Sequence, residues 1–250
     1  MHRTTAFLFV LLIAAAANAA SDKLVHQTAR LDPNGRLTVE THNGSITVTT
    51  WNRPEVDVQA RVEDAVDTTE SDVKATEIRV TGSGASVRIE TDYTGISGWG
   101  LFNFNHSLPP VHYTISMPAT AKLKVTAHNA SAKVRGLRND VEVETHNGPV
   151  DIADLDGAAR VETHNGEVRL AFTRFAKETE IETHNGSIEV QMPPNSAFRI
   201  DADGHHLSFH SDFPATVHGS EASRFTGEVN GGGPALRIST HNGSVRIRKS

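Results

Sequence analysis

The chain contains no cysteine among its 250 residues. This absence excludes a disulfide framework, a thiolate metal ligand and a lipid-anchored cysteine. The fold must therefore be stabilised by buried apolar side chains and by backbone hydrogen bonds. Aromatic residues are also scarce, at 6% of the chain.

Blocks of like charge are absent too. The sequence has 24 Lys and Arg against 30 Asp and Glu, a net charge of −6 with histidine neutral, and the two signs are interspersed. Interspersed charge is typical of solvated outward faces. The acidic balance argues against nucleic acid and against an anionic membrane surface as partners.

No hydrophobic run is long enough to span a bilayer. The longest, residues 6–17, has about a dozen residues against the roughly 20 that a spanning helix needs. It follows Arg3 and precedes Ala17-Asn18-Ala19, a small-x-small cleavage site. The pattern predicts a secretory signal peptide over residues 1–19, with no transmembrane segment left after cleavage. We expect an exported protein, in the periplasm or at the cell surface or beyond it.

The common enzyme motifs are missing. The sequence has no HExxH, no GxSxG, no phosphate-binding glycine loop followed by a helix and no cysteine nucleophile. We therefore predict that the protein is not an enzyme. One alternative stays open, a solenoid enzyme acting on polysaccharides, in which outward acids such as Asp151, Asp154 and Asp156 would form a carboxylate pair across coils.

What the sequence does contain is a repeated tetrapeptide. Thr-His-Asn-Gly occurs five times, each time between residues that alternate apolar and polar, and VTAHNASAKV at Val125–Val134 is a sixth, degenerate copy. His128, His146 and His164 are 18 residues apart, His184 follows after 20, and His184 to His241 is 57, three times 19. Units this short cannot bury a core alone, so they predict stacking.

The alternation indicates a strand, a turn at Asn-Gly and a second strand in each unit. Val161 and Thr163 are expected to face inward with Glu162 outward, and Val168 and Leu170 return inward after the turn. Asn-Gly tolerates positive φ, which favours a tight turn. We favour an all-β, single-chain β-solenoid of about 18–20 residues per coil over a meander of hairpins. Only in a stack do identical residues at successive corners contact one another and form side-chain ladders.

The regular period begins near residue 121. We therefore divide the mature chain, residues 20–250, into irregular strands and loops over 20–120 and regular coils over 121–250. In the irregular part we expect strands at Leu37–Val39, Val56–Val62, Ile78–Val80, Val87–Ile89 and Tyr113–Met117. The polar stretch Glu63–Glu77 reads as a loop that contains a short helix.

Histidine at every corner suggests a metal site. In stacked coils the column of His128, His146, His164 and His184 would lie beside a carboxylate column of Glu144, Glu162 and Glu182. Imidazoles on adjacent coils would then converge on one Zn²⁺ or Cu²⁺ ion. We favour a purely structural ladder, in which imidazole stacks on imidazole and asparagine bonds to asparagine, and keep metal binding as the alternative.

Two further segments draw attention. In Asp201–Asp212 the alternation places His206 and His210 outward, about 13 Å apart along a strand and too far to share an ion. We read this segment as a degenerate coil that lost its corner.

The loop at residues 94–110 holds Trp99, Phe102 and Phe104. These aromatics form either a surface that binds an envelope protein or glycan, or a lid over the end of the solenoid.

Segments outside the repeats carry a family resemblance. They occur in a fixed order and are TWNRPEVDVQARV (Thr50–Val62), Val111–Leu137, Val190–Pro214 and Gly231–Lys249. With the corner repeats they make nearly the whole mature chain similar to the bacterial "putative adhesin" domain family of unknown function. The resemblance implies a right-handed β-solenoid, exported or membrane-anchored, with Thr-x-(Ser/Asn)-Gly corners, and it supplies no catalytic residues. This chain departs from the pattern by placing histidine before the asparagine.

Together these observations predict an exported, non-catalytic binding or structural module of the cell envelope. Its partner would be an envelope protein or glycan, and no cofactor is required. Divalent-metal binding by the histidine column is the alternative.

Overall fold

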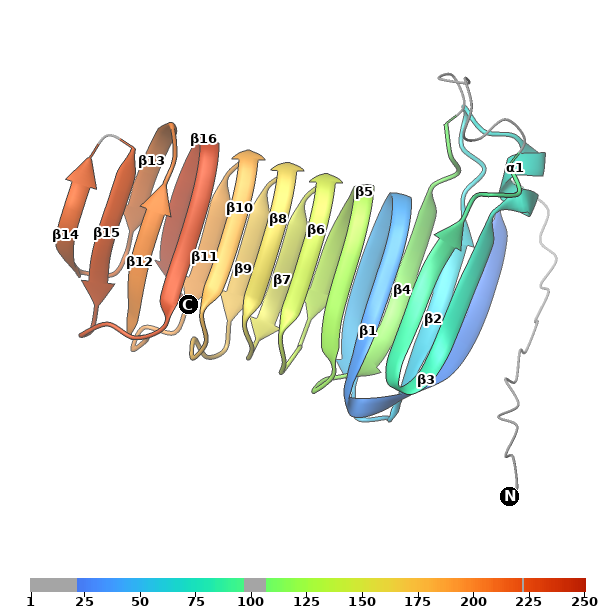
Figure 1. The fold of residues 1–250 in the computed structure, drawn as a ribbon, viewed down its shortest axis with the longest axis horizontal. Helices are drawn as coiled ribbons and strands as arrows, with labels where there is room; N and C mark the ends of the chain where they lie inside the picture. The colour runs from blue at the N-terminus through green and yellow to red at the C-terminus, as the bar shows by residue number, and fades with distance from the viewer. Residues whose placement is uncertain (1–21, 97–106, 222) are drawn as a thin grey trace.

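The computed structural model describes residues 22–96, 107–221 and 223–250, and Figure 1 shows them as one elongated stack of strands. The elements in chain order are β1 (Lys23–Trp51), β2 (Glu55–Val62), α1 (Glu70–Ala75), β3 (Glu77–Asp92), β4 (Val111–Pro118), β5 (Lys122–Arg135), β6 (Val141–Asn147), β7 (Val150–Leu155), β8 (Ala159–Asn165), β9 (Val168–Phe172), β10 (Thr179–Asn185), β11 (Ile188–Met192), β12 (Phe198–Asp203), β13 (His206–Ser211), β14 (Ala215–Glu221), β15 (Arg224–Val229) and β16 (Ala235–Lys249).

Successive repeats stack as parallel strands in register. Val143 of β6 pairs with Val161 of β8, which pairs with Ile181 of β10. These strands make one face of the stack, called the front face below, while β7, β9 and β11 pair in parallel on the opposite face. A meander would pair its strands antiparallel, so the parallel stacking expected from the repeats is confirmed.

The long strands β5 and β16 run through a corner and pair on both faces. The pairing therefore closes on itself in the order β5-β6-β8-β10-β16-β11-β9-β7 and back to β5. Inside lie the inward positions of the alternation. Val161, Thr163, Val168 and Leu170 are buried and Glu162 is exposed, as predicted. The buried apolar side chains form one continuous cluster along the stack.

The order of the coils does not follow the order of the sequence. β16 lies between β10 and β12 on the front face and between β11 and β13 on the opposite face. The 57 residues from His184 to His241, three times 19, therefore do not correspond to three successive coils along the stack. The two corners are direct neighbours, because β16 carries a full Thr-His-Asn-Gly copy that matches the corner of β10.

The amino-terminal part is less regular, as expected. All five predicted strands lie within β1, β2, β3 or β4, and β1 pairs antiparallel with β2 before it joins the parallel stack. A short helix, α1, interrupts the predicted loop and begins with a capping box at Thr69. None of the helices in the described residues is long and apolar enough to cross a membrane. The predicted signal peptide, residues 1–19, lies outside the described residues.

Glycine is needed at the corners mainly because neighbouring coils are closely packed there, and less because the backbone adopts a positive φ. A Cβ added to Gly166 would lie 2.2 Å from the carbonyl oxygen of Gly148, and one added to Gly186 would lie 2.1 Å from that of Gly166. Only Gly44 and Gly148 among the five Thr-His-Asn-Gly glycines have positive φ, and none of the corner asparagines does. The expectation of a positive-φ Asn-Gly turn was therefore correct at two glycines only. Glycine is required because each corner touches the backbone of the next.

Candidate functional site

Seven histidine rings form a continuous column along one edge of the front face. Neighbouring ring centroids are 4.7–4.9 Å apart from His42 through to His241, and the column ends with His205, 5.3 Å from His241. Adjacent rings are inclined by 18° or less, and mostly by 5° or less. In order along the stack the column is His42, His128, His146, His164, His184, His241 and His205. The four predicted members are indeed brought together.

An asparagine ladder runs beside this column. Asn147 Nδ2 donates to Asn129 Oδ1 at 2.7 Å, and Asn165 Nδ2 donates to Asn147 Oδ1 at 2.9 Å. The same bond joins the remaining corners, and at the amino-terminal end Asn43 Nδ2 donates to the carbonyl of Leu108. Identical amides one strand spacing apart satisfy one another, which explains why asparagine recurs at this position.

A row of carboxylates lies parallel to the imidazoles on the same face. Glu144, Glu162 and Glu182 occupy paired positions on β6, β8 and β10. Lys124 contacts Glu144 at 3.0 Å, and it also contacts Glu142. Within the described residues, Glu162 and Glu182 have no cationic partner. Like charges on adjacent strands repel, so these two carboxylates cost stability in the free protein.

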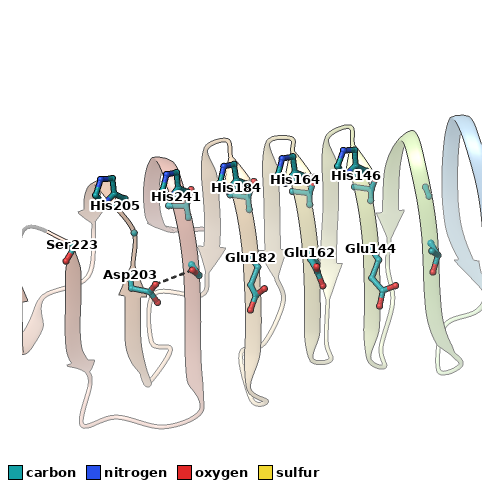
Figure 2. A pocket seen from close by; sticks show the side chains of 18 of the residues that line it. Glu144, His146, Glu162, His164, Glu182, His184, Asp203, His205, Ser223 and His241 are labelled. Carbon is teal, nitrogen blue, oxygen red and sulfur yellow. Dashed lines mark hydrogen bonds between the residues drawn. The ribbon is translucent and has the colours of Figure 1, made fainter. Parts of the chain in front are cut away.

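The carboxylates and the five imidazoles from His146 to His205 along the column line a groove of about 840 Å³. Figure 2 shows the imidazoles in one row and Glu144, Glu162 and Glu182 in the row beside them, with Asp203 and Ser223 toward the carboxy-terminal end. The groove runs along the stack, across the strands from β5 to β15. The strands β6, β8 and β10 each contribute the same set of groups, an imidazole edge, a carboxylate and the threonine between them, whereas β16 has Ser239 at the position of the carboxylate.

The stacked geometry does not by itself hold a metal ion. Two metal–nitrogen bonds of 2.0–2.1 Å span at most about 4.2 Å, whereas nearly parallel rings 4.7–4.9 Å apart keep equivalent nitrogens farther apart. In the described part of the chain no group of three or more His, Asp or Glu side chains is placed to hold a metal. Binding would require rings to rotate out of the stack. Metal binding by this column stays a prediction.

His42, at the amino-terminal end of the column, is partly buried. Partial burial lowers its pKa, and the neighbouring imidazole of His128 lowers it further. A histidine whose pKa is lowered by folding binds fewer protons in the folded state than in the unfolded one. Its contribution to stability is therefore complete above the ordinary histidine pKa of about 6.5 and is lost as the pH falls through the lowered folded value.

Sequence reasoning missed His205 as a member of the column. We read its segment as a coil without a corner, yet Gly204 and His205 make one, and a Cβ at Gly204 would lie 2.1 Å from the carbonyl oxygen of Thr240. The signal was present, because His205 and His241 are 36 residues apart, twice 18. Further along this segment Ser208 and His210 are exposed and Phe213 is buried, as the alternation predicted.

Two other predictions concern a carboxylate pair and the aromatic loop. Asp151 is ion-paired with Arg135 at 2.5 Å, and Asp156 with Arg174 at 2.9 Å. Asp154 has φ of 56°. Two of the three acids proposed for a carboxylate pair are therefore held by arginines. Trp99, Phe102 and Phe104 lie outside the described residues.

Comparison with known proteins supports the family resemblance predicted from the sequence. The model of a family described as Toastrack DUF4097 matches residues 23–248. No curated protein matches the chain. A solved structure described as a "putative cell adhesion protein" from Clostridium sporogenes is 11% identical, with a TM-score of 0.52 over 91% of this chain and 100% of that one. A "putative adhesin" from Bacteroides fragilis is 15% identical, with a TM-score of 0.42 over 91% of this chain and 97% of that one. At these identities the first likeness shows a shared fold, and the predicted resemblance is confirmed.

Proposed function

Because the chain belongs to the Toastrack DUF4097 family, we propose that it is an exported, non-catalytic binding module of the bacterial envelope. In this proposal a right-handed β-solenoid serves as a rigid scaffold and the groove beside the histidine column is its binding face. The names of the similar adhesins support a role in contact with an external partner, an envelope protein or a glycan.

The observation that carries this proposal is the groove. It combines aligned imidazole edges with the carboxylates of Glu162 and Glu182, which no side chain in the described part of the chain neutralises. Adjacent like charges without a partner are unfavourable in the free protein. A bound molecule that donates hydrogen bonds to them relieves this cost, so the arrangement favours ligand binding.

Capture from an envelope fraction tests the proposal. We expect the immobilised protein to retain material from separated protein and glycan fractions of a bacterial envelope, and Glu162→Gln with Glu182→Gln to reduce that retention at least about tenfold, since hydrogen bonds to charged groups contribute about 1.5–3 kcal/mol each. The matched control is Glu189→Gln on the opposite face, which should retain as much as the wild type. Equal retention by the groove variant and the wild type would mean that this face does not bind.

Divalent-metal binding is a second candidate function. The observation in its favour is that Glu162 and Glu182 lie beside the imidazoles and have no cationic partner among the residues that the structure describes. We expect weak binding of Zn²⁺ or Cu²⁺, because the site is open, has no thiolates and requires rings to leave the stack. Binding should weaken as the pH falls through the histidine range, since protons compete for the ring nitrogens.

Titration calorimetry of the metal-free protein at neutral pH measures this binding. His146→Ala with His164→Ala should lower the uptake of metal, while His210→Ala, an exposed histidine outside the column, should leave it unchanged. If the wild type and the double variant take up the same amount, or neither takes up any, the column does not bind metal.

A further inference from the structure

The groove repeats the same chemistry at a fixed interval. Imidazole centroids recur every 4.7–4.9 Å from His146 to His241, and the carboxylates of β6, β8 and β10 recur with them. A ligand that uses equivalent contacts on successive coils must itself repeat at nearly that interval. A sugar unit in an extended polysaccharide is about as long as one strand spacing, which is about 4.8 Å. A compact ligand would contact one or two coils and leave the others unused.

The length of the groove also fits a polymer. Its lining residues come from β5, β6, β8, β10, β16, β12 and the start of β15, which are neighbours in that order. Seven neighbouring strands span six spacings, roughly 29 Å. A chain of roughly six sugar units therefore fills the groove along its whole length.

The groups that face the groove suit hydroxyls. The faces of each inner imidazole are covered by the rings before and after it, so a ligand meets only the ring edges, which carry the nitrogens. A neutral imidazole donates from one nitrogen and accepts at the other, and a carboxylate accepts several hydrogen bonds. Hydroxyl groups donate and accept, so they match both rows.

The charge of the groove excludes acidic polymers. Lys124 neutralises Glu144, and both carboxylate oxygens of Asp201 hold Arg224. The remaining ionised groups that line the groove, Glu162, Glu182 and Asp203, are negative, and Asp203 accepts a hydrogen bond from the neutral hydroxyl of Ser239. A polymer that carries carboxylate, sulfate or phosphate groups would be repelled.

From these observations we propose that the groove binds a linear, hydroxyl-rich polysaccharide without acid groups, laid along the stack and across the strands. This inference rests on the proposed function, since it names the ligand class of the same face. The imidazole and carboxylate rows hydrogen-bond successive sugar units, one unit per coil.

Titration calorimetry with defined oligosaccharides tests the inference. The probes are cello-oligosaccharides and glucosamine oligomers of two to six units, with a galacturonate hexamer as the acidic counterpart. We expect affinity for at least one of the first two series to rise with each added unit up to about six, and the acidic hexamer to bind at least about tenfold more weakly. A preference for glucosamine oligomers over cello-oligosaccharides would assign an amino-bearing polymer, and the reverse a neutral one.

Groove variants complete the test. Glu162→Gln with Glu182→Gln should weaken binding of the preferred hexamer about tenfold or more, and Glu189→Gln on the opposite face should not change it. Thermal melting must show that each variant remains folded, which we expect because Glu162 and Glu182 are exposed and Glu189 is half-buried in a surface ion pair with Arg248. The inference is overturned if neither non-acidic hexamer binds, if affinity is independent of length, or if the acidic hexamer binds best.

Failure here is distinguishable from failure of the proposed function. If retention of envelope material depends on Glu162 and Glu182 but neither non-acidic hexamer binds, the ligand class is wrong and the binding face stands. If retention is unaffected by the groove variant, the binding face itself is wrong.

Discussion

Replacing Gly166 by alanine is expected to lower the free energy of unfolding by about 3 kcal/mol, the upper part of the usual range for overpacking. The added Cβ would lie 2.2 Å from the carbonyl oxygen of Gly148 and 3.0 Å from Thr163 Oγ1. The first contact is with backbone, which cannot move without shifting the neighbouring coil. The φ of Gly166 is outside the left-handed region, so the whole cost is steric. Chemical denaturation followed by circular dichroism measures it.

Gly231→Ala is the matched control. Gly231 has φ of 84°, and a Cβ there would meet nothing within 4 Å, so its cost is conformational only, about 1–2 kcal/mol. A Gly166 variant no less stable than the Gly231 variant would contradict the close-contact explanation of the corner glycine.

Ala130 shows where alanine is tolerated. It occupies the corner position in β5, paired with Gly44. There the strand runs through the corner without interruption, whereas β8 ends at Asn165 and β9 begins only at Val168. The tolerated alanine therefore belongs to a corner of different backbone conformation, and it does not predict tolerance at Gly166.

The sequence was sufficient to predict the composition of one coil. Alternation placed Val161 and Thr163 inside and Glu162 outside, because the period of a strand leaves no other arrangement for these residues. The spacing of the histidines predicted their column, since residues one coil apart become neighbours when coils stack. The corner chemistry was predicted only in part, because the clash that requires glycine is with a different coil and depends on the distance between coils.

The order of the coils could not be predicted. The Thr-His-Asn-Gly copies are chemically equivalent, so the corner of β16 could neighbour any other corner, and no local rule indicates that it lies beside β10. The groove depends on that order, because Asp203 and His205 join the rows only after β16 has been inserted beside β12. Long-range pairing, and not local preference, fixes the carboxy-terminal part of the site.

Replacing Val161 by aspartate is expected to lower the free energy of unfolding by about 4 kcal/mol or more, because it places an unpaired charge in the core. The Val161 side chain is 1% exposed and lies between Val143 and Ile181 on the paired strands. For a chain of this size the melting temperature should fall by roughly 8–16 °C. Thermal melts followed by circular dichroism measure the change.

Val217→Asp makes the same substitution where water can solvate the charge. Val217 lies on β14, at the end of the sheet order, and is 52% exposed, so its variant should change stability by no more than about 0.5 kcal/mol. Val161→Ala removes side-chain volume without adding charge and should cost less than Val161→Asp, which keeps the test informative if the aspartate variant does not fold. Equal melting temperatures for the wild type and both Val161 variants would show that the stacked valines do not form the core. A large loss for the Val217 variant would instead mean that the end of the stack is buried against another molecule.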